Sequence, residues 1–444
     1  MPPALFLMHL QRLLAAAAAI IAAVSCGRAE EQRIVLGDER SDVYLPLLEG
    51  KRVALFSNQT GVVGDLVKGR ETRPQLCTDE TSLDPLLGPG DTSLGPHILD
   101  VLISEGVNVT AIFSPEHGFR GTADAGELVS SSVDEKTGVP ILSLYEEGSH
   151  FPSDENMAKF DVLVVDIQDV GLRYYTYYVT MTHLMDACAM HGKSVVVLDR
   201  PNPNGFYVDG PILDTLNLRT GVGWLPIPTV HGMTLGELAQ MINGEGWLEG
   251  GRKCDLEVVP CLGYTHETKY SLIQRPSPNL KDMKSIYLYS STCYFEGTVV
   301  SGGRGTAFPF ECFGHPALRG YNFSFIPESM PGATSPRYEG EVCYGRDLRG
   351  LPLDSIWAGK INLSYVIEAY AGLNREDPEG WEGEPSIPMG EKFFRKGHFD
   401  ALAGQRYVRE DIMVGKTAGE ISGKWASDVE KFKALRRPYL LYPE

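Results

Sequence analysis

The chain has 444 residues, of which 43% are hydrophobic and 22% are charged, a composition typical of a globular protein with about two domains. Its formal net charge of -18 argues against nucleic acid as a partner, because nucleic-acid binding needs a cationic surface. No run of Lys and Arg offsets this acidic balance.

Residues 1–25 are predicted to be a signal peptide. His9 and Arg12 precede an apolar run over residues 13–24, which is too short to span a bilayer. The small residues directly before Cys26 resemble a bacterial lipoprotein processing site, although Ala23 stands where Leu is usual. We predict lipidation of Cys26, with ordinary signal-peptidase cleavage as the alternative. Either way we expect export to the periplasm or cell envelope, with membrane contact only through a lipid anchor.

Seven cysteines follow Cys26, and an odd number cannot all pair within one chain. No C-x-x-C motif occurs, so neither a zinc knuckle nor a thioredoxin-like site is expected. Export permits a disulfide, but the sequence does not identify one.

Short apolar strands alternate with helices from residue 52 onward. The predicted strands cover residues 52–56, 107–113, 140–145, 160–167 and 194–198, and the predicted helices cover residues 96–105 and 180–191. This pattern predicts a parallel sheet buried on both faces, in a Rossmann-like domain over residues 51–252 that follows a linker over residues 26–50. Residues 68–95 are rich in Gly, Pro and Asp and lack periodicity, which predicts a surface insertion.

Polar residues follow four of these strands at their C-terminal ends, where ligands gather in open parallel sheets. They are Asn58, Gln59 and Thr60; Glu116, His117 and Arg120; Asp166, Gln168, Asp169 and Arg173; and Asp199, Arg200, Asn202 and Asn204. Four such clusters at one sheet edge indicate a site rather than scattered loop polarity.

A second, smaller α/β domain is predicted over residues 253–444, with an active-site cleft between the two domains. Before it, Thr234 and Glu237 form a capping box for a helix over residues 235–243. The second region is expected to begin with a strand over residues 256–260, and its tail shows helical spacing at 362–373 and 418–433.

Several chemistries are excluded by missing motifs. The sequence has no G-x-x-x-x-G-K-[ST], no G-x-G-x-x-G after the first strand, no G-x-S-x-G and no H-E-x-x-H. We therefore expect neither a cofactor nor a metal.

Two dense stretches remain open to more than one interpretation. The four tyrosines around Arg173, at residues 171–178, suit a sugar ring and a carboxylate, or pack the following helix. The Gly-Gly-Arg-Gly at residues 302–305 forms an anion site or a tight turn.

Residues 50–444 closely resemble the exo-acting β-N-acetylmuramidase family. The stretches that carry the resemblance are Ser-Asn-Gln-Thr-Gly at 57–61, Phe-Ser-Pro-Glu-His-Gly-Phe-Arg-Gly at 113–121, Asp-Ile-Gln-Asp-Val-Gly-Leu-Arg-Tyr-Tyr-Thr-Tyr at 166–177, Leu-Asp-Arg-Pro-Asn-Pro-Asn-Gly at 198–205, His-Gly-Met-Thr-Leu-Gly-Glu at 231–237, Pro-Ser-Pro-Asn at 276–279 and Gly-Arg-Gly-Thr at 303–306. The resemblance implies an enzyme that removes N-acetylmuramic acid from the non-reducing end of peptide-free peptidoglycan fragments. It also implies that Glu116 is the catalytic glutamate.

Glycoside hydrolysis needs a carboxyl group that protonates the leaving oxygen, and Glu116 is the expected acid. The second group stays open between Asp166 or Asp169, Tyr175 or Tyr177, and the 2-acetamido group of the substrate. We expect Arg173 and Arg304 to recognise the lactyl carboxylate of muramic acid. The full set of predicted substrate-binding residues is Asn58, His117, Arg120, Gln168, Arg173, Tyr177, Arg200, Asn202, His231, Asn279, Arg304 and Thr306.

Two other classes of protein fit parts of this pattern. A periplasmic sugar-binding lipoprotein would use the same two-domain cleft without needing Glu116. An esterase or amidase acting on cell-wall material is disfavoured, because the sequence lacks a nucleophile motif.

Overall fold

The computed structural model describes residues 33–65, 76–83, 85–115, 119, 132–142, 151–373, 392–395 and 397–444. Residues 35–444 form one compact unit, and the fold below is the fold of that unit.

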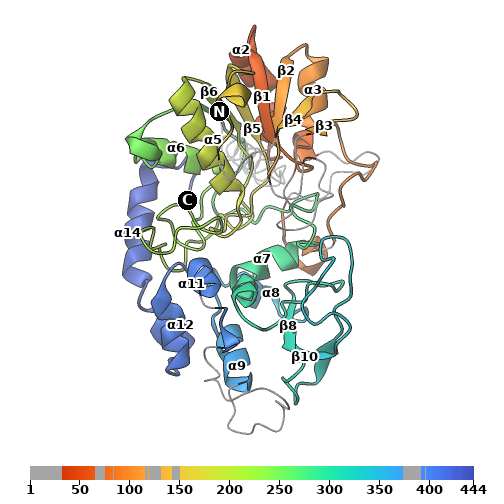
Figure 1. The fold of residues 1–444 in the computed structure, drawn as a ribbon, viewed down its shortest axis with the longest axis vertical. Helices are drawn as coiled ribbons and strands as arrows, with labels where there is room; N and C mark the ends of the chain where they lie inside the picture. Colours follow the sequence, from red (N-terminus) through yellow and green to blue (C-terminus); the bar gives the residue numbers. More distant parts are fainter. Residues whose placement is uncertain are drawn as a thin grey trace, which may run out of the picture. The chain divides into compact units, whose positions relative to one another are not determined.

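A mostly parallel sheet forms the N-terminal half of this unit (Figure 1). Within the described residues its strands are β1 (Arg52–Ser57), β2 (Asn108–Phe113), β3 (Ser132–Val133), β4 (Pro140–Leu142), β5 (Val162–Asp166), β6 (Ser194–Leu198) and β7 (Asp255–Val259). The strand order is β3–β4–β2–β1–β5–β6–β7, and only β3 and β4 pair antiparallel. This topology confirms the predicted Rossmann-like α/β class.

Helices cover the sheet and complete its core. They are α2 (Ser41–Leu48), α3 (Ile98–Ser104), α4 (Asp154–Met157), α5 (Tyr177–His191) and α6 (Leu235–Gly244). Tyr44 of α2 and Leu99 of α3 are fully buried in one hydrophobic cluster with Val164 of β5. The central strands β1, β5 and β6 are buried along nearly their whole length, as expected for a parallel sheet covered on both faces.

The local signals in the sequence position two of these helices. Thr234 and Glu237 form the predicted capping box of α6, with each side chain accepting the backbone N–H of the other residue. Gly192 ends α5 in the left-handed conformation with φ 61°, which favours glycine. The helix itself begins at Tyr177 instead of residue 180, so the tyrosine stretch runs directly into its first turn.

The C-terminal half contains a small antiparallel sheet with the order β8–β10–β9. Its strands are β8 (Cys312–His315), β9 (Phe323–Phe325) and β10 (Cys343–Asp347). The helices of this half are α7 (Met283–Thr292), α8 (Leu353–Ile356), α9 (Ser364–Leu373), α11 (His398–Ala403), α12 (Arg406–Met413), α13 (Ala418–Ser422) and α14 (Ala426–Arg436). A mixed α/β region is therefore present where the sequence predicts one.

Three local predictions need correction. The strand expected to open the second region is β7, which pairs with β6, so the large sheet extends beyond residue 252. The helix expected over residues 418–433 is two helices, α13 and α14. The proposed surface insertion buries Leu83, Leu86 and Leu94, because its described part pairs with residues 270–282.

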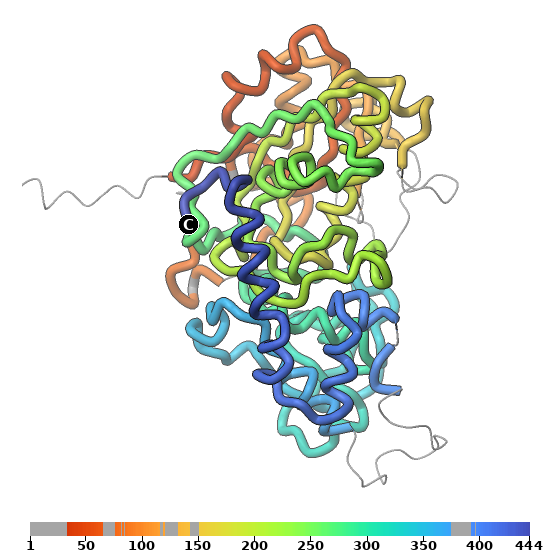
Figure 2. The backbone as a smooth tube through the Cα atoms, turned by 90° about the vertical axis from the view of Figure 1, so that its left-hand side faces the viewer, coloured from red at the N-terminus to blue at the C-terminus, as the bar shows by residue number. Residues whose placement is uncertain are grey.

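The C-terminal residues return to the large sheet. Figure 2 shows α14, in dark blue, running back from the C-terminal helices toward α6. Beyond it, the Tyr442 hydroxyl donates to the Asp199 carboxylate at 2.6 Å, just past the end of β6. The backbone N–H of Leu441 donates to Glu237 at 2.8 Å. The end of β6 is therefore covered by the chain itself.

None of the helices in the described residues combines the length and apolar character needed to cross a membrane. The seven cysteines after Cys26 are all buried. Over the same described residues, no group of three or more His, Cys, Asp or Glu side chains is arranged to hold a metal ion.

Candidate active site

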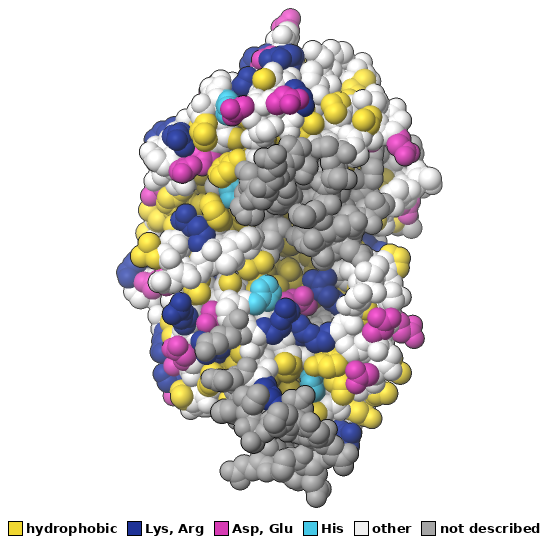
Figure 3. Space-filling model, viewed as in Figure 1, with side chains coloured by type: hydrophobic (Ala, Val, Ile, Leu, Met, Phe, Trp, Pro, Cys, Tyr) yellow, Lys and Arg dark blue, Asp and Glu magenta, His cyan; other side chains and the backbone are white. Residues whose placement is uncertain are grey.

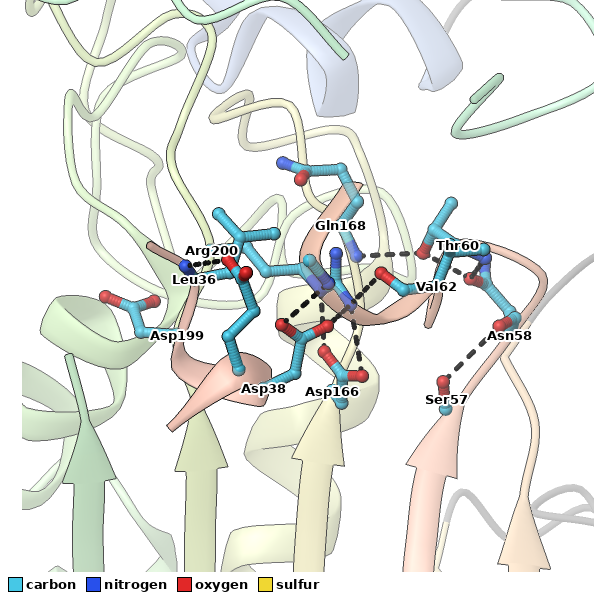
Figure 4. A network of polar contacts seen from close by, with 12 residues as sticks. Leu36, Asp38, Ser57, Asn58, Thr60, Val62, Asp166, Gln168, Asp199 and Arg200 are labelled. Atoms are coloured by element: carbon cyan, nitrogen blue, oxygen red, sulfur yellow. Dashed lines mark hydrogen bonds and ion pairs between the residues drawn. The ribbon is translucent and has the colours of Figure 1, made fainter. Parts of the chain in front are cut away.

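A buried ion-pair cluster lies at the carboxyl end of β5 (Figure 4). Arg200 donates from Nε to Asp166 at 2.6 Å and from a terminal nitrogen to Asp38 at 2.5 Å. The side chains of both aspartates are fully buried, and that of Arg200 is nearly so. Charges removed from water need close partners of this kind. Asp166 is thus an ion-pair partner of Arg200, and Arg200 binds two carboxylates of the protein. The predicted catalytic role of Asp166 and the predicted substrate contact of Arg200 stay predictions.

The loop after β1 is tied to the loop after β5. Asn58 accepts hydrogen bonds from the backbone N–H and the hydroxyl of Thr60, at 2.9 and 2.6 Å. The Thr60 hydroxyl in turn accepts the backbone N–H of Gln168 at 3.0 Å, as Figure 4 shows. The Gln168 side chain donates to the carbonyls of Asp169 and Pro201, both at 2.8 Å. These amides hold the strand-end loops in place, and they are buried.

Asn202 has a similar structural position. Its side chain donates to the Met233 carbonyl at 2.9 Å and accepts the backbone N–H of Asn204 at 2.8 Å. Gly171, with φ 75°, lies so close that a Cβ would stand 2.2 Å from the Asn202 amide nitrogen. The motif glycine is therefore required by close approach of two loops. His231 is buried nearby, and burial lowers its pKa to about 3, so it is neutral at physiological pH.

Arg173 is also part of the protein interior. Its side chain is fully buried and donates to the carbonyls of Pro211, Ile227 and Leu402 at 2.6, 3.0 and 2.9 Å. It therefore links the sheet edge to α11. Its described hydrogen bonds all go to carbonyls of the protein, so the binding of the lactyl carboxylate by Arg173 stays a prediction.

Tyr175 and Tyr177 face the segment at residues 276–279. Both hydroxyls donate to the Pro276 carbonyl, at 2.8 and 2.9 Å, and Tyr177 also accepts from the Asn58 amide at 2.9 Å. Burial raises the pKa of Tyr175 well above its ordinary value. A tyrosine nucleophile needs to lose its proton, so this environment opposes the predicted nucleophilic role of Tyr175.

A cavity of about 140 Å³ lies between the sheet edge and the C-terminal half. We call it the tyrosine cavity, because residues 174–177 line it from the sheet side. From the C-terminal half, Asn279, Glu296, Arg304 and His398 line it. The structure thus brings four predicted site residues to one place, namely Tyr175, Tyr177, Asn279 and Arg304. Burial and the Arg395 charge lower the pKa of His398.

A second cavity of about 410 Å³ adjoins the first, and both are lined by Glu296 and Arg304. We call it the arginine cavity, because Arg337 also lines it. Figure 3 shows Lys and Arg side chains with a His gathered in the hollow in the middle of this face. Arg304 donates from Nε to the Glu296 carboxylate at 3.2 Å, and its guanidinium carbon lies 5.0 Å from the Phe310 ring centre.

Asp169 is a buried carboxyl group with an incomplete set of partners. One oxygen accepts the backbone N–H of Gly171 at 2.6 Å, and the other has no hydrogen-bond partner among the described residues. Burial raises the pKa of Asp169 to about 7, against the opposing effect of two backbone N–H groups. This carboxyl group is protonated in a substantial fraction of molecules at neutral pH.

Comparison with known proteins identifies the family. The N-terminal model of exo-β-N-acetylmuramidase NamZ matches residues 75–284, and the C-terminal model matches residues 287–442. The chain belongs to the exo-β-N-acetylmuramidase family.

Relatives and solved structures cover nearly the whole chain. The peptidoglycan β-N-acetylmuramidase NamZ of Bacillus subtilis strain 168 is 35% identical over 415 residues, which span 90% of this chain and 89% of that protein. A crystal structure of a DUF1343 family protein from Bacteroides fragilis NCTC 9343 is 49% identical, with a TM-score of 0.77, and covers 93% of this chain and 99% of its own. A second one from the same strain is 26% identical, with a TM-score of 0.69, and covers 92% and 99%.

The family motif that carries the expected acid lies mostly outside the described residues. Glu116, His117 and Arg120 fall there, and the described strand β2 leads to it through Pro115. Thr306 is described, and its hydroxyl donates to the Gly303 carbonyl at 2.7 Å within the Gly-Arg-Gly-Thr turn. That turn positions Arg304, whereas Thr306 itself is buried.

The cavity residues that were not predicted from the sequence include Glu296, Arg337 and His398. Glu296 begins the stretch that leads to the Gly-Gly-Arg-Gly turn. Its negative charge, eight residues before Arg304, could have suggested that the two side chains form an ion pair. Arg337 and His398 lie in stretches without a recognisable motif. Only the fold places Arg337 in the arginine cavity and His398 in the tyrosine cavity of this exo-β-N-acetylmuramidase family member.

Proposed function

We propose that the protein is an exo-acting glycoside hydrolase that releases N-acetylmuramic acid from the non-reducing end of peptide-free peptidoglycan fragments. The observation that carries the proposal is family membership across nearly the whole described fold, with 35% identity to the Bacillus subtilis enzyme over 90% of this chain. A role in cell-wall turnover or recycling follows from this substrate.

The cavity chemistry is consistent with a muramyl substrate. Aromatic side chains at residues 174–177 offer faces for a sugar ring, and Arg304 offers a cation for a carboxylate. Arg304 already has an orientation, because Glu296 holds its Nε and Phe310 lies against its guanidinium group. We therefore favour Arg304 over Arg173 as the proposed ligand of the lactyl carboxylate.

Glu116 remains the proposed general acid. A glycosidase acid protonates the leaving oxygen in the transition state, and such a step contributes about 10²–10⁴-fold to the rate. The described contacts argue against Asp166, Tyr175 and Tyr177 as the second group. Arg200 engages the carboxylate of Asp166, and both tyrosine hydroxyls donate to the Pro276 carbonyl. Two alternatives are left for the second group: the Asp169 carboxyl and the 2-acetamido group of the substrate.

Export and lipidation of Cys26 are proposals that rest on the sequence alone. Residues 1–32 lie outside the described residues. An anchored enzyme would act on saccharides in the cell envelope, which agrees with a peptidoglycan-derived substrate.

The test uses two isomeric disaccharides. The enzyme should release both sugars from N-acetylmuramic acid β-1,4-linked to N-acetylglucosamine, in which the muramyl residue is at the non-reducing end. It should leave the isomer with the sugars in reverse order intact, because the exo mode requires a terminal muramyl residue. Binding of the first disaccharide without release would instead support the sugar-binding lipoprotein, and cleavage of the reverse isomer would contradict the muramidase assignment.

A further inference from the structure

The arginine cavity has an excess of positive charge in an acidic protein. Arg304 and Arg337 line it, with Glu296 as its lining carboxylate among the described residues. Arg395 lies close enough to influence the pKa of Arg337 and donates to the Glu296 backbone carbonyl at 3.3 Å. The chain has a formal net charge of -18, so a local excess of cations here is not the average property of its surface.

The two arginines that line the cavity differ in their partners. Arg304 has an ion pair with Glu296, which compensates part of its charge. Arg337 donates from one terminal nitrogen to the backbone carbonyls of Thr298 and Val300, the latter at 2.9 Å. Within the described residues, Arg337 has no carboxylate at ion-pair distance.

A half-buried guanidinium without a carboxylate partner favours an anionic ligand. Burial lowers the pKa of Arg337, and the Arg395 and Arg304 charges lower it further, against the opposing effect of the Glu296 charge. The backbone carbonyls of Thr298 and Val300 accept hydrogen bonds from one terminal nitrogen of the Arg337 guanidinium group, so this group is oriented before a ligand binds. A carboxylate has the geometry that a guanidinium binds best, through two parallel hydrogen bonds.

We propose that Arg337, together with Arg304, binds the free lactyl carboxylate of the terminal muramyl residue and is the residue that selects for that carboxylate. The inference rests on the proposed function and names the specificity determinant of the same site. N-acetylglucosamine lacks the lactyl group, and a peptide stem converts the carboxylate into a neutral amide. Arg337 therefore discriminates against both glucosaminyl ends and peptide-bearing muramyl ends.

The contribution of Arg337 should depend on the charge of the substrate. Hydrogen bonds to charged groups are stronger than those between neutral groups, so loss of Arg337 should lower kcat/KM on the free carboxylate by about 10- to 100-fold. The loss should fall mainly on KM, since the carboxylate is bound in the ground state as well as in the transition state. A substrate without the charge should lose less than about 3-fold.

The experiment compares kcat/KM for the muramyl–glucosamine disaccharide and for the same disaccharide with its lactyl carboxylate converted to a carboxamide. The variants are Arg337→Met and Arg337→Gln, of which the second keeps an N–H donor for the Thr298 and Val300 carbonyls. Arg346→Met is the matched control, because Arg346 is a half-exposed cation of β10 that is paired with Glu368 at 2.7 Å, outside both cavities.

The proposal predicts a large loss for both Arg337 variants on the carboxylate substrate, little loss on the carboxamide, and no change for Arg346→Met. Equal losses on the two substrates, or no loss on the carboxylate, would overturn it. If wild type cleaves neither disaccharide, the proposed function itself fails. If wild type cleaves both disaccharides equally well, the proposed function stands and the selection by Arg337 is refuted. If one variant does not fold, the two-substrate ratio of the other still decides.

Discussion

Removing the charge of Arg200 should destabilise the fold far more than removing the charge of Asp166. The Arg200→Met substitution leaves the carboxylates of Asp38 and Asp166 buried without this cation, at positions where it now lies within 2.6 Å of each. Breaking a buried ion pair by deleting one partner costs about 3–5 kcal/mol. The Asp166→Asn substitution keeps the Arg200–Asp38 pair and an acceptor oxygen, so we expect a loss of about 1–2 kcal/mol.

The assay is urea unfolding of wild type, both variants and an exposed control. Arg52→Met is that control. Arg52 at the start of β1 forms an ion pair at 2.7 Å with Asp161, just before the start of β5, and both side chains are more than 40% exposed. Exposed ion pairs contribute little to stability, so this variant should stay close to wild type.

Activity of the folded Asp166→Asn variant separates a structural carboxylate from a catalytic one. An ion-pair partner leaves kcat within about 10-fold of wild type, whereas loss of a catalytic carboxylate lowers it by about 10²–10⁴-fold. Wild-type stability combined with a kcat reduced by more than about 100-fold would refute the assignment of Asp166 to the Arg200 cluster and restore it as a catalytic group.

Three further predictions concern single side chains. The carboxyl of Asp169 has a folded pKa of about 7 against an ordinary value of 3.8, so its contribution to stability is present below about pH 4 and is lost as the pH rises through 7. Asp169→Asn, which stays neutral, should therefore gain stability relative to wild type by up to about 4 kcal/mol between pH 4 and pH 8 in urea unfolding, and a constant difference would contradict the raised pKa. Tyr175→Phe removes one of the donors to the Pro276 carbonyl, so unfolding should cost about 1 kcal/mol less and kcat should fall less than about 10-fold; abolished turnover in a folded variant would point back to a tyrosine nucleophile. Cys26→Ala should move the protein expressed in a bacterial host from the detergent phase to the aqueous phase of a partition assay, and equal partitioning of wild type and variant would exclude the lipid anchor.

The layer architecture could be predicted because the local signals were strong. The apolar stretches at 52–56 and 194–198 correspond to β1 and β6, and the capping box of Thr234 and Glu237 begins α6. That β7 belongs to the large sheet could not be predicted, because the sequence of a strand does not specify which strand it pairs with. The hydrogen bond from Tyr442 to Asp199 joins residues 243 positions apart, and no local sequence pattern predicts it.

The candidate site was predicted only in part, for a physical reason. Polar residues at strand ends either line a cavity or hold the loops around it in place. The same residue types serve in both roles, so the sequence does not distinguish them. Tyr175 and Arg304 line a cavity, whereas Asp166 and Arg173 satisfy buried partners. Arg337 comes from a stretch with no motif, and the fold alone places it in the arginine cavity.

The central claim is that this chain hydrolyses the muramyl bond with Glu116 as its acid. The most direct measurement is release of free N-acetylmuramic acid from the muramyl–glucosamine disaccharide by wild type and by Glu116→Gln, with binding of the disaccharide measured in parallel. We predict turnover by wild type and a loss of about 100-fold or more in a folded variant that still binds the disaccharide. Full activity of Glu116→Gln, or binding without turnover by wild type, would contradict this account.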